Sequence, residues 1–188
     1  LENTRVVRFH PTLRWLLVAQ KHATVVDGSA DILIVESATG KRLHKLAVDD
    51  ATSGAENGVT DIAFTFDGRW MLVVSRASNL LVYDSNLSST SLPNHQIGFG
   101  NSKLMRAVAL RTGQVVVLGR APDGSSRLWS LAATSWKIEA MREFPKGLTD
   151  IEADDDHNCI ILSEAGRVQI VHPITLETTD FFPDMPHG

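Results

Sequence analysis

The chain has 188 residues, of which 43% are hydrophobic and 21% are charged, and its formal net charge is −4. This composition excludes a disordered or fibrous chain and fits one domain with a substantial core. The negative charge argues against a nucleic-acid binder that relies on a bulk positive field, and the longest apolar runs are too short to span a bilayer.

The first unit of the chain, residues 5–58, opens with a segment that returns later in the sequence. Residues 6–19 lie over residues 61–74 without a gap. The two segments share three residue types in register, at Phe9/Phe64, Arg14/Arg69 and Trp15/Trp70. A β-branched run at 32–36 follows a longer connection and predicts the third strand of this unit.

The second unit, residues 59–103, has the clearest strand pattern. Short β-branched runs between turn signals predict four strands, at about 59–64, 70–75, 79–84 and 92–98. The sequence Phe66-Asp67-Gly68 predicts the first hairpin turn, because Gly accepts a positive φ and Asp can bond its own backbone.

The third and fourth units, residues 104–147 and 148–188, repeat the same frame. Their predicted third strands lie at 127–130 and 168–172, and the triplet Thr-Asp-Ile is shared by residues 60–62 and 149–151. The single cysteine, Cys159, cannot form an internal disulfide, and its apolar neighbours predict a buried thiol in a strand.

Repeated four-stranded units of about 40–45 residues are typical of β-propeller blades. One such sheet cannot bury both of its apolar faces alone, whereas stacked blades cover each other. We therefore predict an all-β fold in which residues 1–188 form a single propeller segment of about four antiparallel, four-stranded blades.

The second unit resembles the first hairpin of the WD-repeat family, at residues 61–75, and Tyr83-Asp84 is similar to the Trp-Asp pair that closes such a repeat. The corresponding positions in the other units are Val35-Glu36, Trp129-Ser130 and Val171-His172, so no unit carries the full pair. The resemblance implies a ring that usually has more than four blades. We therefore expect this chain to be completed by missing blades or by another chain, with a closed four-bladed ring as the alternative.

No pattern in the sequence points to catalysis or to a cofactor. The seven histidines lack metal-ligand spacing, and the acidic run 154–156 lacks the glycine and terminal glutamate of a helical calcium loop. We interpret that run as a solvated turn.

Four charged residues are expected on the first strands of the blades, which line the central channel of a propeller: Asp61, Arg106, Asp150 and Glu152. Several carboxylates converging there would suit a metal site, but the mixed signs favour structural ion pairs. An enzyme or small-ligand binder with a channel site remains an alternative.

A row of cations follows the second strands of three consecutive units. Lys21, Arg76 and Arg120 share one position in the repeat, where the fourth unit has Glu164. Focused positive charge on an acidic protein suits an acidic peptide, a phosphate or an RNA backbone. The alternative is that these are ordinary solvated turn residues.

Two aromatic sites lie in predicted fourth strands, at Trp136 and at Phe181-Phe182. They are candidates to anchor a neighbouring subunit, or else they pack between blades.

We predict a non-enzymatic scaffold, without cofactor, that binds other protein subunits within a larger complex. An RNA- or phosphate-contacting module is the alternative. Residues 1–5 do not resemble the start of an export signal, so we expect an intracellular protein, cytoplasmic or nuclear.

Overall fold

The computed structural model describes residues 4–21, 30–48, 58–76, 78–86, 92–145, 147–154, 159–163 and 166–180. These residues form β-strands and no helix, in four sheets of four strands each, which we call blades 1 to 4. Blades 1 and 2 contain β1 (Thr4–Phe9), β2 (Trp15–Lys21), β3 (Ala30–Glu36), β4 (Arg42–Val48), β5 (Val59–Phe64), β6 (Trp70–Ser75), β7 (Asn79–Asp84) and β8 (His95–Gly98). Blades 3 and 4 contain β9 (Lys103–Ala109), β10 (Gln114–Arg120), β11 (Ser126–Ala132), β12 (Lys137–Phe144), β13 (Leu148–Ala153), β14 (Cys159–Ser163), β15 (Val168–Val171) and β16 (Thr178–Asp180).

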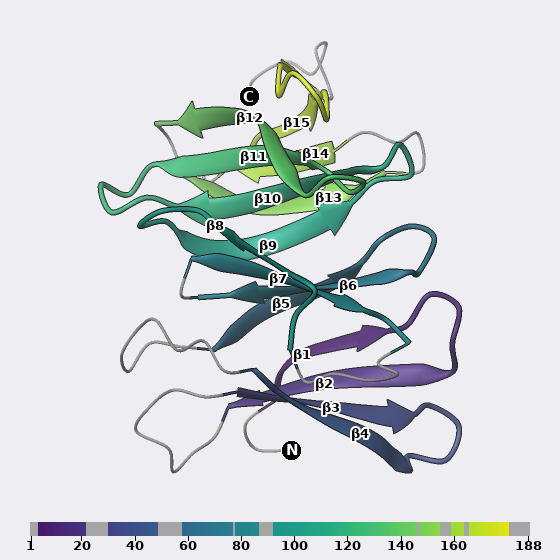
Figure 1. Cartoon of the computed structure of the whole chain (residues 1–188). Helices are drawn as coiled ribbons and strands as arrows, with labels where there is room; N and C mark the ends of the chain where they lie inside the picture. Colours follow the sequence, from purple (N-terminus) through teal and green to yellow (C-terminus); the bar gives the residue numbers. More distant parts are fainter. Residues whose placement is uncertain are drawn as a thin grey trace.

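Each blade is an antiparallel meander in which every strand pairs with its neighbours in the sequence. Figure 1 shows the four sheets stacked in chain order, from blade 1 near the N-terminus to blade 4 near the C-terminus. The predicted strands of the second unit are confirmed for the first three, and the fourth begins at His95, three residues later than predicted.

The first hairpin turn of blade 2 forms where the sequence predicts it. Gly68 has a φ of 69°, and its amide donates to the carbonyl of Thr65 at 2.8 Å. The Asp67 carboxylate accepts hydrogen bonds from Thr65 Oγ1 at 2.6 Å and from the Arg69 amide at 3.0 Å. The turn therefore depends on the two residue types that predicted it.

A β-bulge interrupts the first strand of every blade, at the same place. The register between first and second strands shifts around Arg5, Thr60, Met105 and Thr149. A bulge adds one residue to one strand and redirects the side chains beside it. The bulge is therefore part of the repeat, although the alternation of apolar residues along the strands does not reveal it.

The hydrophobic core consists of three layers, each between two consecutive blades. In β6, Met71 and Val73 pack toward blade 1, whereas Leu72 and Val74 pack toward blade 3. An inner sheet therefore has two apolar faces, which explains why its strands read as continuous apolar runs.

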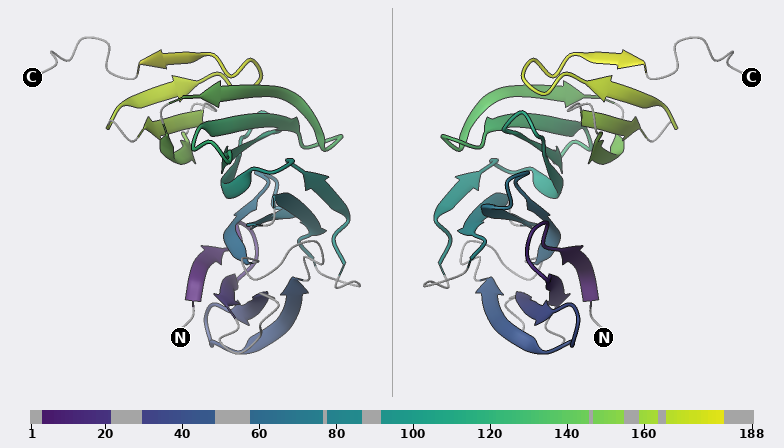
Figure 2. Two further views of the ribbon diagram at one scale, coloured as in Figure 1. Left: turned by 90° about the vertical axis from the view of Figure 1, so that its left-hand side faces the viewer. Right: turned by 90° about the vertical axis from the view of Figure 1, so that its right-hand side faces the viewer.

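The first strands lie next to one another from blade to blade: β1 contacts β5, β5 contacts β9, and β9 contacts β13. Figure 2 shows the blades following an open arc, with blades 1 and 4 at its two ends. The fold is a partial β-propeller, and the predicted all-β fold class is confirmed.

Candidate partner-binding site

The structure places two of the three predicted cations at one boundary between blades. Arg76 directly follows β6 in blade 2, and Arg120 is the last residue of β10 in blade 3. Lys21 ends β2, but its side chain, like residue Glu164, lies outside the described residues.

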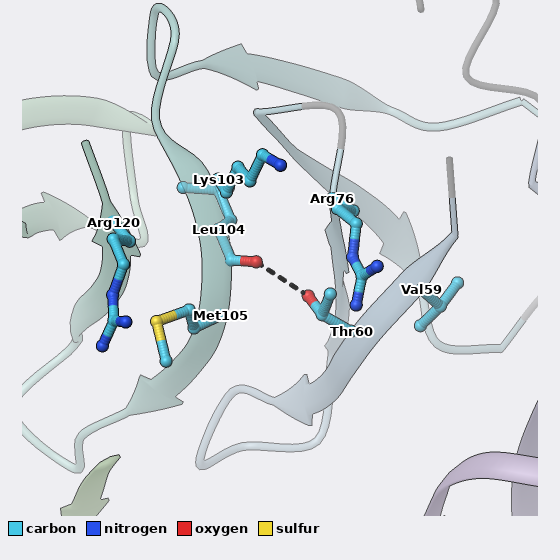
Figure 3. Close-up of a pocket in the computed structure, with 7 residues that line it drawn as sticks. All are labelled: Val59, Thr60, Arg76, Lys103, Leu104, Met105 and Arg120. Carbon is cyan, nitrogen blue, oxygen red and sulfur yellow. Dashed lines mark hydrogen bonds between the residues drawn. The ribbon is translucent and has the colours of Figure 1, made fainter. Parts of the chain in front are cut away.

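Arg76 and Arg120 line the same pocket, of about 630 Å³, between blades 2 and 3. Figure 3 shows the two arginine side chains on opposite sides of β9, which carries Lys103, Leu104 and Met105 between them. The predicted cation row is therefore a pocket at this boundary, where two adjacent blades contribute one arginine each.

The bulges of the two first strands shape the floor of the pocket. Thr60, the bulged residue of β5, donates from Oγ1 to the carbonyl of Leu104 at 3.2 Å and also lies 3.2 Å from the carbonyl of Val74. Met105, the bulged residue of β9, lies half-buried in the same lining. The Thr60 hydroxyl therefore connects blade 2 to blade 3 beside the pocket.

Lys103 is a third cation of the pocket, and it is absent from the predicted set. It begins β9 and pairs directly with Arg120 across the sheet. The corresponding residues of blades 2 and 4 are Gly58 and Gly147, so no repeated charge marks the position in the sequence. The antiparallel pairing of first and second strands is the signal that could have found it.

Among the described residues, seven line the pocket: three cations, four uncharged residues and no acidic residue. The Leu104 side chain is buried in the core between blades 2 and 3, whereas Met105 and the two arginines are half-buried and Lys103 is exposed. None of the lining residues is aromatic. The pocket can therefore bind anionic groups beside a small apolar surface, but it offers no ring for stacking.

Trp136 lies away from this pocket, in the turn before β12 rather than in a fourth strand as expected. It has a φ of 56° and is only 7% exposed. Its ring packs edge-on against Trp70 at 6.0 Å and lies 5.9 Å from the ring of His95. Here the ring packs between blades 2 and 3, the second of the two predicted possibilities. The other aromatic candidates, Phe181 and Phe182, lie outside the described residues.

The charged residues of the first strands form ion pairs from blade to blade. Arg8 Nη2 donates to Asp61 Oδ1 at 2.8 Å, and the Ala107 amide donates to Asp61 Oδ2 at 3.3 Å. Burial raises the pKa of Asp61, and the nearby Arg8 opposes this rise. The predicted structural ion pairing is confirmed for this carboxylate.

Arg106 continues the series toward blade 4. Its guanidinium hydrogen-bonds the Asp150 carboxylate and lies 2.9 Å from Glu152 Oε2, while its Nε lies 3.8 Å from Asp61. The carboxylates proposed for a channel site are thus each bonded to an arginine. Together, Arg8, Asp61, Arg106, Asp150 and Glu152 form what we call the charge ladder.

Among the described residues, no group of three or more His, Cys, Asp or Glu side chains could hold a metal ion. Of the acidic run 154–156, only Asp154 lies within the described residues, so the predicted solvated turn falls mostly outside them. In the same part of the chain, no helix is long and apolar enough to cross a membrane.

No protein-family model matches the sequence, and no curated protein does. Solved structures resemble the fold at low sequence identity, and three of them are β-propellers of the following kinds. The β-propeller domain of Myceliophteria thermophila Cps50 (Swd1) has a TM-score of 0.66 at 16% identity and covers 94% of this chain and 53% of its own. The structure of U3-55K has a TM-score of 0.71, and that of the RRP9 WD40 repeats has a TM-score of 0.69. Each is 14% identical and covers 95% of this chain and 51% of its own.

The chain therefore has a WD-repeat-like β-propeller fold and spans about half the length of these similar chains. This agrees with the open arc of four blades.

Proposed function

We propose that this propeller is a non-enzymatic scaffold of an intracellular multiprotein complex and that it binds an acidic protein segment at the pocket of Arg76, Lys103 and Arg120. The observation that carries the proposal is the convergence of Arg76 and Arg120, from two consecutive blades, on one pocket. Propellers hold such sites on rigid walls built from repeated sheets. Completion of the ring by further blades or by another chain is part of the same proposal.

Carboxylates are the groups that this lining fits best. A guanidinium presents donors in a planar fork that matches a carboxylate, and two arginines on opposite sides can hold two acidic residues of one segment. The half-buried Met105 lies between them and offers an adaptable apolar surface to the intervening side chain. The preferred ligand is an extended segment with acidic residues around an apolar one.

RNA is the second candidate, because phosphates also pair with arginine. Single-stranded RNA is usually held by aromatic side chains that stack on its bases. The lining residues that the structure describes include no aromatic one, and the net charge of the chain is −4. These two observations favour a protein ligand.

Charge reversal tests the proposal. The variant Arg76→Glu with Arg120→Glu should weaken binding of a fluorescent Glu-Leu-Glu-containing peptide by about tenfold or more, because each lost charge-assisted hydrogen bond contributes about 1.5–3 kcal/mol. Fluorescence anisotropy at low and high salt measures the affinity. A peptide with Gln in place of Glu and a single-stranded RNA of similar length are the comparison ligands.

A matched variant, Arg42→Glu with Lys137→Glu, changes the net charge equally at exposed residues of β4 and β12. It should bind the acidic peptide like the wild type. Equal losses in both variants would reduce the effect to net charge and contradict the pocket. Tight binding of the RNA alone would favour the second candidate.

A further inference from the structure

The outer face of blade 1 is apolar. In blades 2, 3 and 4 the corresponding face packs against the preceding blade. Val7 of β1 corresponds in the repeat to Ile62, Ala107 and Ile151, each of which packs against the preceding blade. Val7 is 44% exposed, whereas the other three are 0%, 2% and 1% exposed. The difference arises because no blade precedes blade 1 within the described structure.

The apolar surface continues across the sheet of blade 1. Val7 pairs with Val18, which is 8% exposed, and Val18 pairs with the half-buried Leu33. In the next row, Leu16 pairs with Val35, and both are half-buried. Leu17 and Ile34, which alternate with these residues, pack toward blade 2. The outer face therefore has the apolar composition of a blade-to-blade contact.

The opposite end of the arc presents the complementary side of such a contact. Asp150 and Glu152 of β13 lie at repeat positions that, in other blades, bond the following blade. Arg106 of blade 3 is an example, because it bonds both of these acids in blade 4. The Glu152 side chain is 65% exposed and that of Asp150 is 44% exposed. Val168 and Ile170 of β15 are half-buried.

The charge ladder alternates in sign along the blades: Arg8 in blade 1, Asp61 in blade 2, Arg106 in blade 3, and Asp150 with Glu152 in blade 4. Arg106 bonds acids on both of its neighbours. Among the described acidic residues, Arg8 pairs with Asp61 of blade 2 alone, and its Nε also donates to the Ile62 carbonyl at 3.0 Å. The Arg8 side chain is 39% exposed. A blade seated on β13 would continue the alternation if its first strand carried a cation, and blade 1 carries one.

We propose that a second copy of this chain covers both open ends. The acidic end of blade 4 in each copy meets the outer face of blade 1 in the other, so that Asp150 and Glu152 lie beside Arg8. Two identical head-to-tail junctions close under a two-fold axis. This dimer specifies the ring completion of the proposed function and rests on it. The pocket of Arg76, Lys103 and Arg120 lies at an internal boundary, so loss of peptide binding and loss of the dimer are separate results.

Sedimentation of the full chain over about 1–100 μM tests this proposal, because a reversible dimer forms by mass action. The expected species has twice the mass of the 20.6 kDa chain. Val7→Asp places a charge on the outer face and should leave a monomer. Glu152→Arg opposes Arg8 and should weaken the dimer by about tenfold or more. Circular dichroism verifies that both variants keep their strands.

Mixing the two variants distinguishes a head-to-tail junction from any other. The Val7→Asp chain retains its acidic end, and the Glu152→Arg chain retains its apolar face, so the mixture should associate through one intact junction. Ile138→Asp, at an exposed apolar residue of the outermost strand β12, is the matched control and should dimerise normally.

Three results would overturn the proposal. The first is a wild-type chain that stays monomeric, because the outer faces of blades 1 and 4 would then be covered by something other than a second copy. The second is a Val7→Asp dimer as stable as the wild type. The third is a mixture of the two variants that does not associate.

Discussion

His10 illustrates how one residue combines packing with a titratable group. Its Nδ1 accepts hydrogen bonds from the Leu13 amide at 3.0 Å and the Thr12 amide at 3.2 Å, at the turn after β1. Its ring lies 4.7 Å from that of Phe64, across the boundary with blade 2. Burial lowers the pKa of His10, because the imidazolium is poorly solvated there.

This lowered pKa predicts that the protein loses stability in mild acid. Unfolded His10 takes up a proton near pH 6.5, whereas the folded residue resists protonation, so the free energy of unfolding falls as the pH drops below about 6.5. His10→Asn keeps an acceptor at the turn but cannot titrate. It should flatten the dependence of Tm on pH between about pH 7.5 and 5.5.

The exposed His44 on β4 provides the control, and His44→Asn should retain the wild-type slope. Identical slopes in the His10→Asn variant and the wild type would show that another group controls the pH dependence.

At the scale of single strands, β10 contains a glycine whose role is steric. A Cβ on Gly119 would lie 3.0 Å from Trp129 Cζ3, 3.1 Å from Leu104 Cδ2 and 3.2 Å from the carbonyl oxygen of Lys103. The indole of β11 therefore packs directly over the backbone of β10. This glycine is needed for close approach rather than for a turn.

Gly119→Ala should destabilise the chain by about 1–3 kcal/mol through overpacking. Gly98→Ala in β8 is the matched change, because its Cβ would meet only Asn79 Oδ1, at an ordinary 3.6 Å. Urea unfolding of the two variants measures the difference. Equal stabilities would mean that the indole moves aside without loss.

Over the whole molecule, the charge ladder connects all four blades along their first strands. Its centre is Asp61, whose side chain is 5% exposed, and its end is Glu152, which is largely exposed. A buried ion whose partner is removed is costly, whereas an exposed pair contributes little. Position along the arc thus decides what each charge contributes.

Asp61→Ala should lower the free energy of unfolding by about 1–3 kcal/mol, because the Ala107 amide loses its acceptor and the partly exposed Arg8 and Arg106 lose the carboxylate between them. Glu152→Ala should lower it by at most about 1 kcal/mol in the monomeric chain. Denaturant unfolding at low protein concentration tests both variants. Similar losses at the two positions would contradict a ladder that is strongest at its buried centre.

Local sequence determined the four meanders, because strand alternation and the Asp-Gly turn operate within a few residues. It also identified Arg76 and Arg120 through their shared repeat position, and it indicated the ion pairs of the first strands.

Tertiary structure alone decided the rest. The bulges and the contribution of Lys103 depend on the register between strands, and the burial of Trp136 depends on the packing of one blade against the next. Val7 on the outer face of blade 1 is apolar like Ile62, Ala107 and Ile151 at the same repeat position, yet it is 44% exposed and they are buried. Only the presence or absence of a neighbouring blade in space distinguishes these positions.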